Sequence, residues 1–148
     1  MIVFIGEHTA KLDDKGRLIF PSPFKALISQ EGDMRLVIKK DLFANCLSVF
    51  TYEEWCRESE GVKARLNFFN REHSLFWREY MRDRAIVEPD EKLGRISIPK
   101  RLLEQIGVDK EVVFSGNDHK IEVWAKEEFE KVRLPENDYT ALTEKILG

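Results

Sequence analysis

One short sequence unit occurs twice in this chain, and the repeat restricts the possible folds more than any other feature. The two copies read KLDDKGRLIFP over residues 11–21 and DEKLGRISIP over residues 90–99. Aligning their glycines also aligns an arginine and a proline. Three further matches follow downstream in the same order: LVI with VVF, LSVF with IEVW, and EEW with EEF. Ordered matches across half the chain favour an internal duplication over chance similarity.

Each copy predicts the same order of short elements. A strand leads into an acid-x-x-Gly-Arg turn, because glycine adopts a positive φ without steric cost, and a second strand ends at a proline that introduces a helix. Ser22 is expected to cap the first of these helices, and Gly107 to end the second. Two more strands follow, and Thr51 with Glu54 fits a capping box at the next helix. Each unit is therefore β-β-α-β-β, and the predicted fold class is α+β and strand-rich.

The size of the unit predicts that the two copies pack together. About 50 residues are too few to bury a sufficient core alone, so we expect packing about a pseudo-twofold axis. Residues 1–58 form the first unit and residues 85–133 the second. Between them, residues 59–84 carry aromatic side chains at helical spacing, which predicts an amphipathic helix or helix pair. We expect its aromatic face to pack on the chain's own strands, and the alternative is a contact with another subunit. Residues 134–148 form a C-terminal tail with a short helix.

Composition limits the compartment and the kind of binding surface. No apolar run approaches the roughly 20 residues that span a bilayer, and the N-terminus has no basic flank of a signal peptide. Cys46 and Cys56 have no metal-type spacing and are expected to be reduced thiols in a cytoplasmic protein. The net charge is −3. Because DNA phosphates attract basic side chains, any DNA-binding surface must be a local one.

The two Gly-Arg turns hold the candidate functional residues. Asp13 and Glu91 are expected to brace the turns by pairing with the arginine four residues on, while Gly16 and Gly94 permit the bend. A rigid turn suits recognition, since arginine can bind guanine O6 and N7 through two hydrogen bonds. The candidate DNA-binding residues are Arg17, Lys15 and Lys11 at the first turn, with Lys25 nearby, and Arg95 and Lys92 at the second.

The two turns are not expected to contribute equally. Leu93 occupies the position aligned with Lys15, so the second turn is predicted to carry less charge. Glu91 is one methylene longer than the aspartate of the first copy, which alters the expected brace. We therefore predict the larger contribution from Arg17.

LDDKGRL followed by Phe20-Pro21, together with GRISIP in the second copy, resembles the MraZ family of bacterial regulators. The likeness covers nearly the whole chain, including the helical insert. It implies two AbrB-like halves whose swapped hairpins form a pseudo-dimeric barrel, each half with an Asp-x-x-x-Arg signature. It further implies a sequence-specific DNA-binding transcriptional regulator, assembled as a ring-shaped homo-oligomer and associated with the nucleoid. The implied target is double-stranded DNA at tandem G-rich repeats in its own promoter, upstream of a division and cell-wall gene cluster.

Two other function classes compete with this one. An enzyme is disfavoured because the three histidines do not lie at metal-ligand spacing and no nucleophile, phosphate or dinucleotide motif is present, so we expect no cofactor, metal or small-molecule substrate. The paired acids EE at 53–54 and 127–128 lie at predicted helix starts, where carboxylates favour the helix dipole. The alternative within the same fold is an antitoxin-like module that binds a protein partner. The short, partly apolar tail argues against it.

Overall fold

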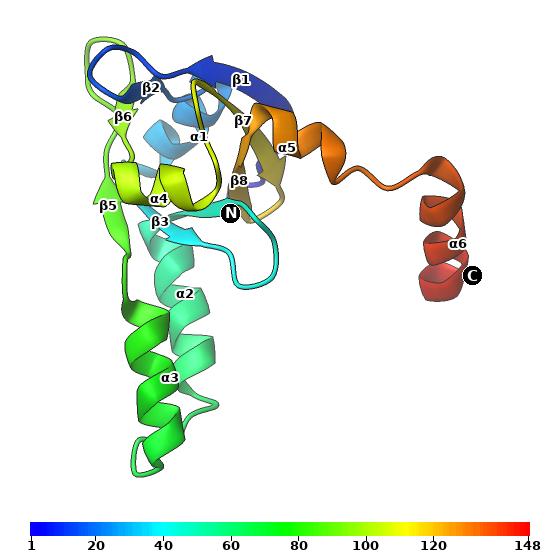
Figure 1. Cartoon of the computed structure of the whole chain (residues 1–148). Helices are drawn as coiled ribbons and strands as arrows, with labels where there is room; N and C mark the ends of the chain where they lie inside the picture. Colours follow the sequence, from blue (N-terminus) through cyan, green and yellow to red (C-terminus); the bar gives the residue numbers. More distant parts are fainter.

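The computed structural model describes all 148 residues and contains both predicted units in the predicted order (Figure 1). The first unit comprises β1 (Glu7–Lys11), β2 (Arg17–Ile19), α1 (Ser22–Glu31), β3 (Leu36–Lys40), β4 (Leu47–Thr51) and α2 (Tyr52–Lys63). The second comprises β5 (Ala85–Val87), β6 (Arg95–Ser97), α4 (Lys100–Gln105), β7 (Glu111–Asn117), β8 (Lys120–Ala125) and α5 (Lys126–Lys131). Two helices lie outside the repeat, α3 (Arg71–Met81) and α6 (Glu136–Leu147). The predicted α+β, strand-rich fold class is confirmed.

The two units exchange their first strands. The main sheet has six strands in the order β1-β7-β8-β4-β3-β5, so β1 of the first unit pairs with β7 of the second, and β5 of the second pairs with β3 of the first. β4 and β8 join the two halves, and every pair is antiparallel. A separate two-stranded sheet pairs β2 with β6, again one strand from each unit. The expected packing of the units on each other is confirmed, whereas closure into a swapped-hairpin barrel stays a prediction.

The main hydrophobic core lies between these strands and helices α1 and α4. It contains 18 buried residues drawn from both units. Phe24 and Ile28 lie one turn apart on α1, and the Phe24 ring packs edge-on against Phe4 with centroids 5.3 Å apart. Leu18 and Ile96, the central residues of β2 and β6, belong to the same core and are fully buried. Full burial of such a side chain stabilises the fold by about 1.5–3 kcal/mol, so the strands that carry the two turns are firmly anchored.

A second, smaller core fixes the base of the helical hairpin formed by α2 and α3. The rings of Trp55 and Tyr80 stack with centroids 5.8 Å apart. Lys39 of β3 is buried beside them, with its Nζ 3.1 Å from Glu58 Oε2 and 4.9 Å from the Tyr80 ring centroid. Burial lowers the pKa of Lys39, and the neighbouring Glu58 carboxylate opposes that shift. These contacts tie the hairpin to β3 and β4.

Beyond its base the hairpin projects from the body of the molecule (Figure 1). Phe69, Leu75 and Phe76 are all exposed. The predicted helix pair is confirmed, but the insert packs on the chain's own strands only near Trp55 and Tyr80. Because α2 runs from Tyr52 to Lys63 without a break, no structural boundary falls at residue 58.

The helix ends follow two of three expectations. Thr51 Oγ1 accepts a hydrogen bond from the Glu54 amide at 3.2 Å, as predicted. Gly107 follows α4 with φ +72°, and its N–H donates to the Glu104 carbonyl, also as predicted. The predicted cap at Ser22 is wrong. Pro21 holds the N-cap position with no side-chain bond, because Ser22 already lies in the first helical turn.

The C-terminal helix α6 stands apart from the rest of the molecule. It follows α5 after residues 132–135, and Figure 1 shows it away from the strands and from the hairpin. Every residue of α6 is exposed. None of the helices is long and apolar enough to span a membrane.

Candidate nucleic-acid interface

The pairing of β2 with β6 brings the two Gly-Arg turns to one surface. Leu18 pairs with Ile96, which is its equivalent in the repeat, so a local twofold axis passes between them. Arg17 and Arg95 are therefore symmetry equivalents at diagonal positions, where Cα atoms lie about 7–8 Å apart. Side chains alternate along a strand, and since Leu18 and Ile96 point into the core, both arginines face outward.

The Asp13 carboxylate braces the first turn. Its Oδ1 accepts the backbone N–H of Lys15 at 2.9 Å and of Arg17 at 2.8 Å, and its Oδ2 accepts Arg17 Nε at 2.8 Å. Gly16 has φ +76° and donates its N–H to the Asp13 carbonyl. The hydrogen bond from the Arg17 backbone is the first cause that lowers the pKa of Asp13. The carboxylate thus stays charged and holds the guanidinium plane.

The second turn is braced by Asp90 and not by the predicted Glu91. Asp90 Oδ1 accepts the backbone N–H groups of Leu93, Gly94 and Arg95, and its Oδ2 accepts Arg95 Nε at 2.5 Å. No hydrogen bond or ion pair of the chain involves the exposed Glu91 side chain, whereas the backbone bond from Leu93 leads the causes that lower the pKa of Asp90. The second turn is one residue longer than the first between its aspartate and its glycine. DDKGR corresponds to DEKLGR with Leu93 as the extra residue, so Lys92 is the counterpart of Lys15.

Both guanidinium groups are held at one nitrogen and open at the other two. The side chains of Arg17 and Arg95 are 27% and 21% exposed, and within the chain only their Nε atoms donate hydrogen bonds from the guanidinium. The terminal nitrogens are free for the two parallel hydrogen bonds that arginine makes with guanine or phosphate.

Lysines surround the pair, and one of them crosses between units. Lys15 and Lys92 are exposed and form no ion pair, while Lys11 is 3.9 Å from Glu111 and 78% exposed. Lys25 of α1 lies against the second turn rather than the first, with its Cδ 3.2 Å from the point where a Cβ on Gly94 would stand. No local sequence signal indicates this contact, because it depends on how the units pack. The second turn is therefore not short of positive charge, contrary to the prediction from Leu93.

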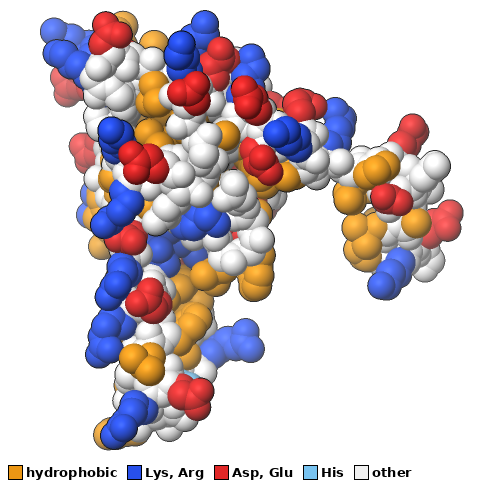
Figure 2. All heavy atoms as spheres, in the orientation of Figure 1, with side chains coloured by type: hydrophobic (Ala, Val, Ile, Leu, Met, Phe, Trp, Pro, Cys, Tyr) orange, Lys and Arg blue, Asp and Glu red, His pale blue; other side chains and the backbone are white.

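Basic and acidic side chains mix at the corner of the molecule that carries the two turns (Figures 1 and 2). The two acids closest to the arginines are already used as their braces. The positive charge that remains available there belongs to Arg17, Arg95 and the lysines Lys15, Lys25 and Lys92. Asp14 and Glu91 are exposed acids of the same turns and form no ion pair, so basic side chains exceed acidic ones there only slightly. The local basic surface expected on a chain with a net charge of −3 is thus a small head around the two turns.

Comparison with known proteins agrees with this arrangement. The sequence profile of the MraZ family, described as an antitoxin-like MraZ protein, matches residues 3–79 and 83–145. The chain belongs to the MraZ family.

Relatives with the name Transcriptional regulator MraZ share this similarity over most of their length. A protein of Bacteroides fragilis is 38% identical over 99% of this chain and 92% of its own. A protein of Bacteroides thetaiotaomicron is 35% identical over 100% of this chain and 94% of its own, and one of Dictyoglomus thermophilum is 35% identical over 91% and 88%. The two MraZ matches each contain one Gly-Arg turn, and the first extends through α2 and most of α3.

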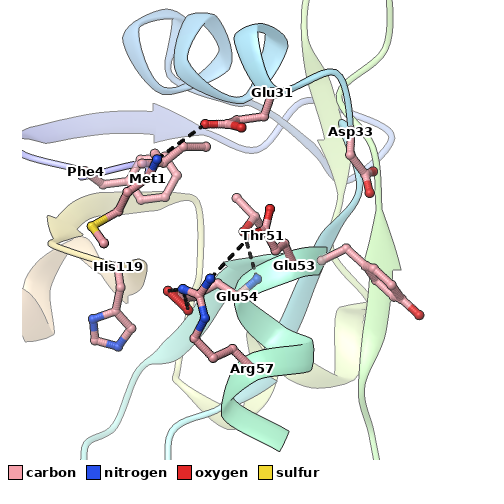
Figure 3. Close-up of a pocket in the computed structure, with 11 residues that line it drawn as sticks. Met1, Phe4, Glu31, Asp33, Thr51, Glu53, Glu54, Arg57 and His119 are labelled. Carbon is pink, nitrogen blue, oxygen red and sulfur yellow. Dashed lines mark hydrogen bonds and ion pairs between the residues drawn. The ribbon is translucent and has the colours of Figure 1, made fainter. Parts of the chain in front are cut away.

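A pocket of about 130 Å³ lies elsewhere, between the N-terminus, the end of α1 and the start of α2 (Figure 3). Its lining is rich in acids, but their charges are met within the chain. Arg57 pairs with Glu53 and Glu54, and the Met1 amino group lies 3.9 Å from Glu31. The charged side chains that line the pocket therefore form structural ion pairs with one another.

Other reactive groups serve packing. No group of three or more His, Cys, Asp or Glu side chains is placed to hold a metal ion. Cys46 is buried, and burial raises the pKa of its thiol to about 12, so the thiol stays protonated and acts as a core side chain.

Proposed function

We propose that this chain is a sequence-specific DNA-binding transcriptional regulator that reads base edges through Arg17 and Arg95. The single observation that carries the proposal is the pairing of β2 with β6, which presents two aspartate-braced arginines side by side with their terminal nitrogens free. The names of the MraZ relatives support the regulatory role.

Each residue of the turns has a distinct task in this proposal. The arginines supply discrimination, since a bidentate contact with guanine is worth about 1–3 kcal/mol. Lys11, Lys15, Lys25 and Lys92 contact phosphates, which positions the head without reading sequence. Asp13 and Asp90 preserve the arginine geometry, and Gly16 and Gly94 preserve the turns.

The proposed target is a set of tandem G-rich repeats in the protein's own promoter, upstream of a bacterial division and cell-wall gene cluster. A single head offers few contacts. Linked heads on repeated sites raise the effective concentration, and avidity can then exceed the affinity of one head by ~10²–10⁴. A ring-shaped homo-oligomer associated with the nucleoid would meet this need.

The test is binding to DNA from the protein's own upstream region, measured by fluorescence anisotropy at several salt concentrations. Arg17→Ala and Arg95→Ala should each weaken binding by roughly 5- to 150-fold, the range of one bidentate contact. Lys15→Ala should weaken all sequences alike and reduce the salt dependence by about one phosphate.

Arg57→Ala is the matched control, because it removes an exposed arginine that pairs with Glu53 and Glu54 on α2. It should bind as wild type does. If both turn variants retain wild-type affinity, the turns are structural and DNA reading by them is wrong.

The antitoxin-like description of the family favours one second candidate, a module whose main ligand is another polypeptide. The same experiment separates the two. A stoichiometric protein partner that co-purifies, with no DNA binding even at low salt, would favour the protein-binding function.

A further inference from the structure

Helix α6 cannot be explained by contacts within its own chain. It has 12 residues and none is buried, whereas isolated helices shorter than ~12–15 residues are marginal in water. Its apolar side chains Tyr139, Leu142 and Ile146 recur at i, i+3 and i+7 and so form one face. They are 65%, 42% and 67% exposed. A helix with such a face is stabilised by packing that face against another surface.

One side of α3, together with Phe68 of the loop before it, forms an apolar groove of complementary form. The groove has a volume of about 470 Å³ and is lined by Phe68, Ser74, Trp77, Arg78, Met81 and Arg82. Phe68 and Trp77 meet edge to face with ring centroids 5.9 Å apart, and Phe68 and Met81 are 47% and 42% exposed. Ser74, Trp77 and Met81 also follow the spacing i, i+3 and i+7, with the small Ser74 leaving room at one end.

Length and charge of the two surfaces agree. At 1.5 Å per residue, Tyr139 to Ile146 and Ser74 to Met81 each extend about 10 Å along a helix. Arg78 makes no ion pair within the chain, and Arg82 has only Glu79 at 3.7 Å, so the groove has a positive edge. α6 is acidic: Glu136, Asp138 and Glu144 outnumber Lys145. The carboxylates of α6 can therefore pair with Arg78, which has no partner within its own chain.

The groove that α6 would occupy is not that of its own chain. Only residues 132–135 separate α5 from α6, and four residues span at most about 14 Å when fully extended. Figure 1 shows α3, which carries the groove, at the lower left of the molecule and α6 far from it at the right. The groove of a second copy of the chain is accessible to α6, because the short linker to α5 does not limit where that copy lies.

We infer that α6 of one copy docks into the Phe68–Trp77–Met81 groove of a second copy, with Tyr139, Leu142 and Ile146 in the groove and the acids of α6 against Arg78 and Arg82. The two surfaces differ, so the contact is head-to-tail, and each copy both offers one helix and receives one. The inference rests on the homo-oligomer of the proposed function and names the contact between its copies, and it does not use the Gly-Arg turns.

The test is the molar mass of the full chain in solution, measured by light scattering after size exclusion over a range of concentrations. Wild type should exceed the 17.4 kDa of one chain. Leu142→Glu on the helix and Met81→Glu in the groove should each reduce the mass to that of a monomer. Phe43→Glu is the matched control, because Phe43 is 97% exposed in the β3–β4 loop and belongs to neither surface.

Mixing the two variants separates a lost contact from a lost fold. The helix of the Met81→Glu chain and the groove of the Leu142→Glu chain are both intact, so an equimolar mixture should form a heterodimer and nothing larger. Wild-type mass in both variants would overturn the inference, as would a mixture that stays monomeric while both chains keep the wild-type circular dichroism.

Separate measurements test the docking of α6 and the reading of DNA by the Gly-Arg turns. Arg17→Ala should leave the molar mass unchanged, and Leu142→Glu should keep the wild-type affinity for a duplex with a single repeat. Affinity for a duplex with several repeats should fall in Leu142→Glu, because linked heads are lost.

Discussion

At the level of single residues, the two turns differ by one inserted residue and still hold their arginines alike. Asp13 reaches Arg17 Nε across four positions, and Asp90 reaches Arg95 Nε across five. The aspartate side chain is short and rigid enough to accept turn amides and the guanidinium together. Arg17 and the two glycines could be assigned from their spacing alone. Asp90 could not, since Glu91 stands at the aligned distance and only the folded loop decides between neighbouring acids.

Substitution of the two neighbouring acids tests this assignment. Asp90→Ala should weaken DNA binding, by less than Arg95→Ala, because the arginine remains but loses the carboxylate that orients it. Glu91→Ala should bind as wild type or slightly more tightly, since it removes an exposed negative charge near phosphates. Anisotropy titrations of the two variants give the answer, and an equal loss from both would contradict the assignment to Asp90.

The braces also predict a pH dependence. Backbone N–H groups and the arginines hold the pKa of Asp13 and of Asp90 below the ordinary 3.8. A carboxyl whose folded pKa is depressed stabilises the fold fully above its unfolded pKa and loses that contribution as the pH falls through the folded pKa. The braces should therefore stay intact from pH 7 to about pH 4. Carboxyl ¹³C NMR titration should place the Asp90 midpoint below 3.8, and a midpoint at or above that value would rule out the brace.

At the level of elements, the helical hairpin is held to the sheet by a buried charge. The Lys39 side chain is 6% exposed and the Glu58 side chain 33%. Helical spacing of the insert predicts a helix pair, as observed. The position of Lys39 beneath it could not be foreseen, because a lysine in a strand pattern normally indicates a solvated face. Aromatic spacing in the insert leaves open whether its apolar face packs on the chain's own strands or on another subunit, because spacing alone does not distinguish a core from an exposed apolar surface. In the structure Phe69, Leu75 and Phe76 of this segment are exposed.

Removal of either member of the Lys39–Glu58 pair should have unequal effects on stability. Glu58→Gln leaves a buried ammonium without its counter-charge and should cost about 1–3 kcal/mol, less than the ~3–5 kcal/mol of fully buried pairs because Glu58 is partly exposed. Lys39→Met replaces the charge with an apolar side chain of similar length that packs well on aromatic rings, and should be neutral or stabilising.

Urea unfolding measures both changes as shifts in the free energy of unfolding. The double variant Lys39→Met/Glu58→Gln should recover part of the loss seen in Glu58→Gln, because the buried ammonium is then gone. Arg84, whose guanidinium lies 4.9 Å from the Tyr80 ring centroid, still lacks the Glu58 charge in that variant. Additive losses in the double variant would show that the two side chains do not interact.

At the level of the whole molecule, neither unit is complete without the other. β1 finds its partner in β7, and β5 finds its partner in β3, so each half of the chain closes the sheet of the other. The repeat predicts that two small units share a core. Strand exchange itself follows from tertiary pairing, which β-branched runs of three to five residues do not specify. The contact of Lys25 with the opposite turn is a product of the same exchange.

Cutting the chain in the loop between α2 and α3 tests this dependence. Residues 1–66 and residues 67–148 should each be unfolded as monomers, because each lacks strands that its sheet requires. An equimolar mixture should regain dispersed amide signals in a two-dimensional ¹H–¹⁵N NMR spectrum. A dispersed spectrum from a monomeric 1–66 fragment alone would show that the units fold independently.

The local twofold between Leu18 and Ile96 has a consequence for the layout of promoters. A head assembled from two identical chains presents identical arms, and such proteins match palindromic sites. Here both arms belong to one chain, and the insertion of Leu93 and the reach of Lys25 make them unlike. A head with two unlike arms binds the duplex in one preferred orientation. Several such heads held in one orientation should bind a series of direct repeats. Inverting one repeat should reverse the orientation of the head bound to it relative to the neighbouring heads.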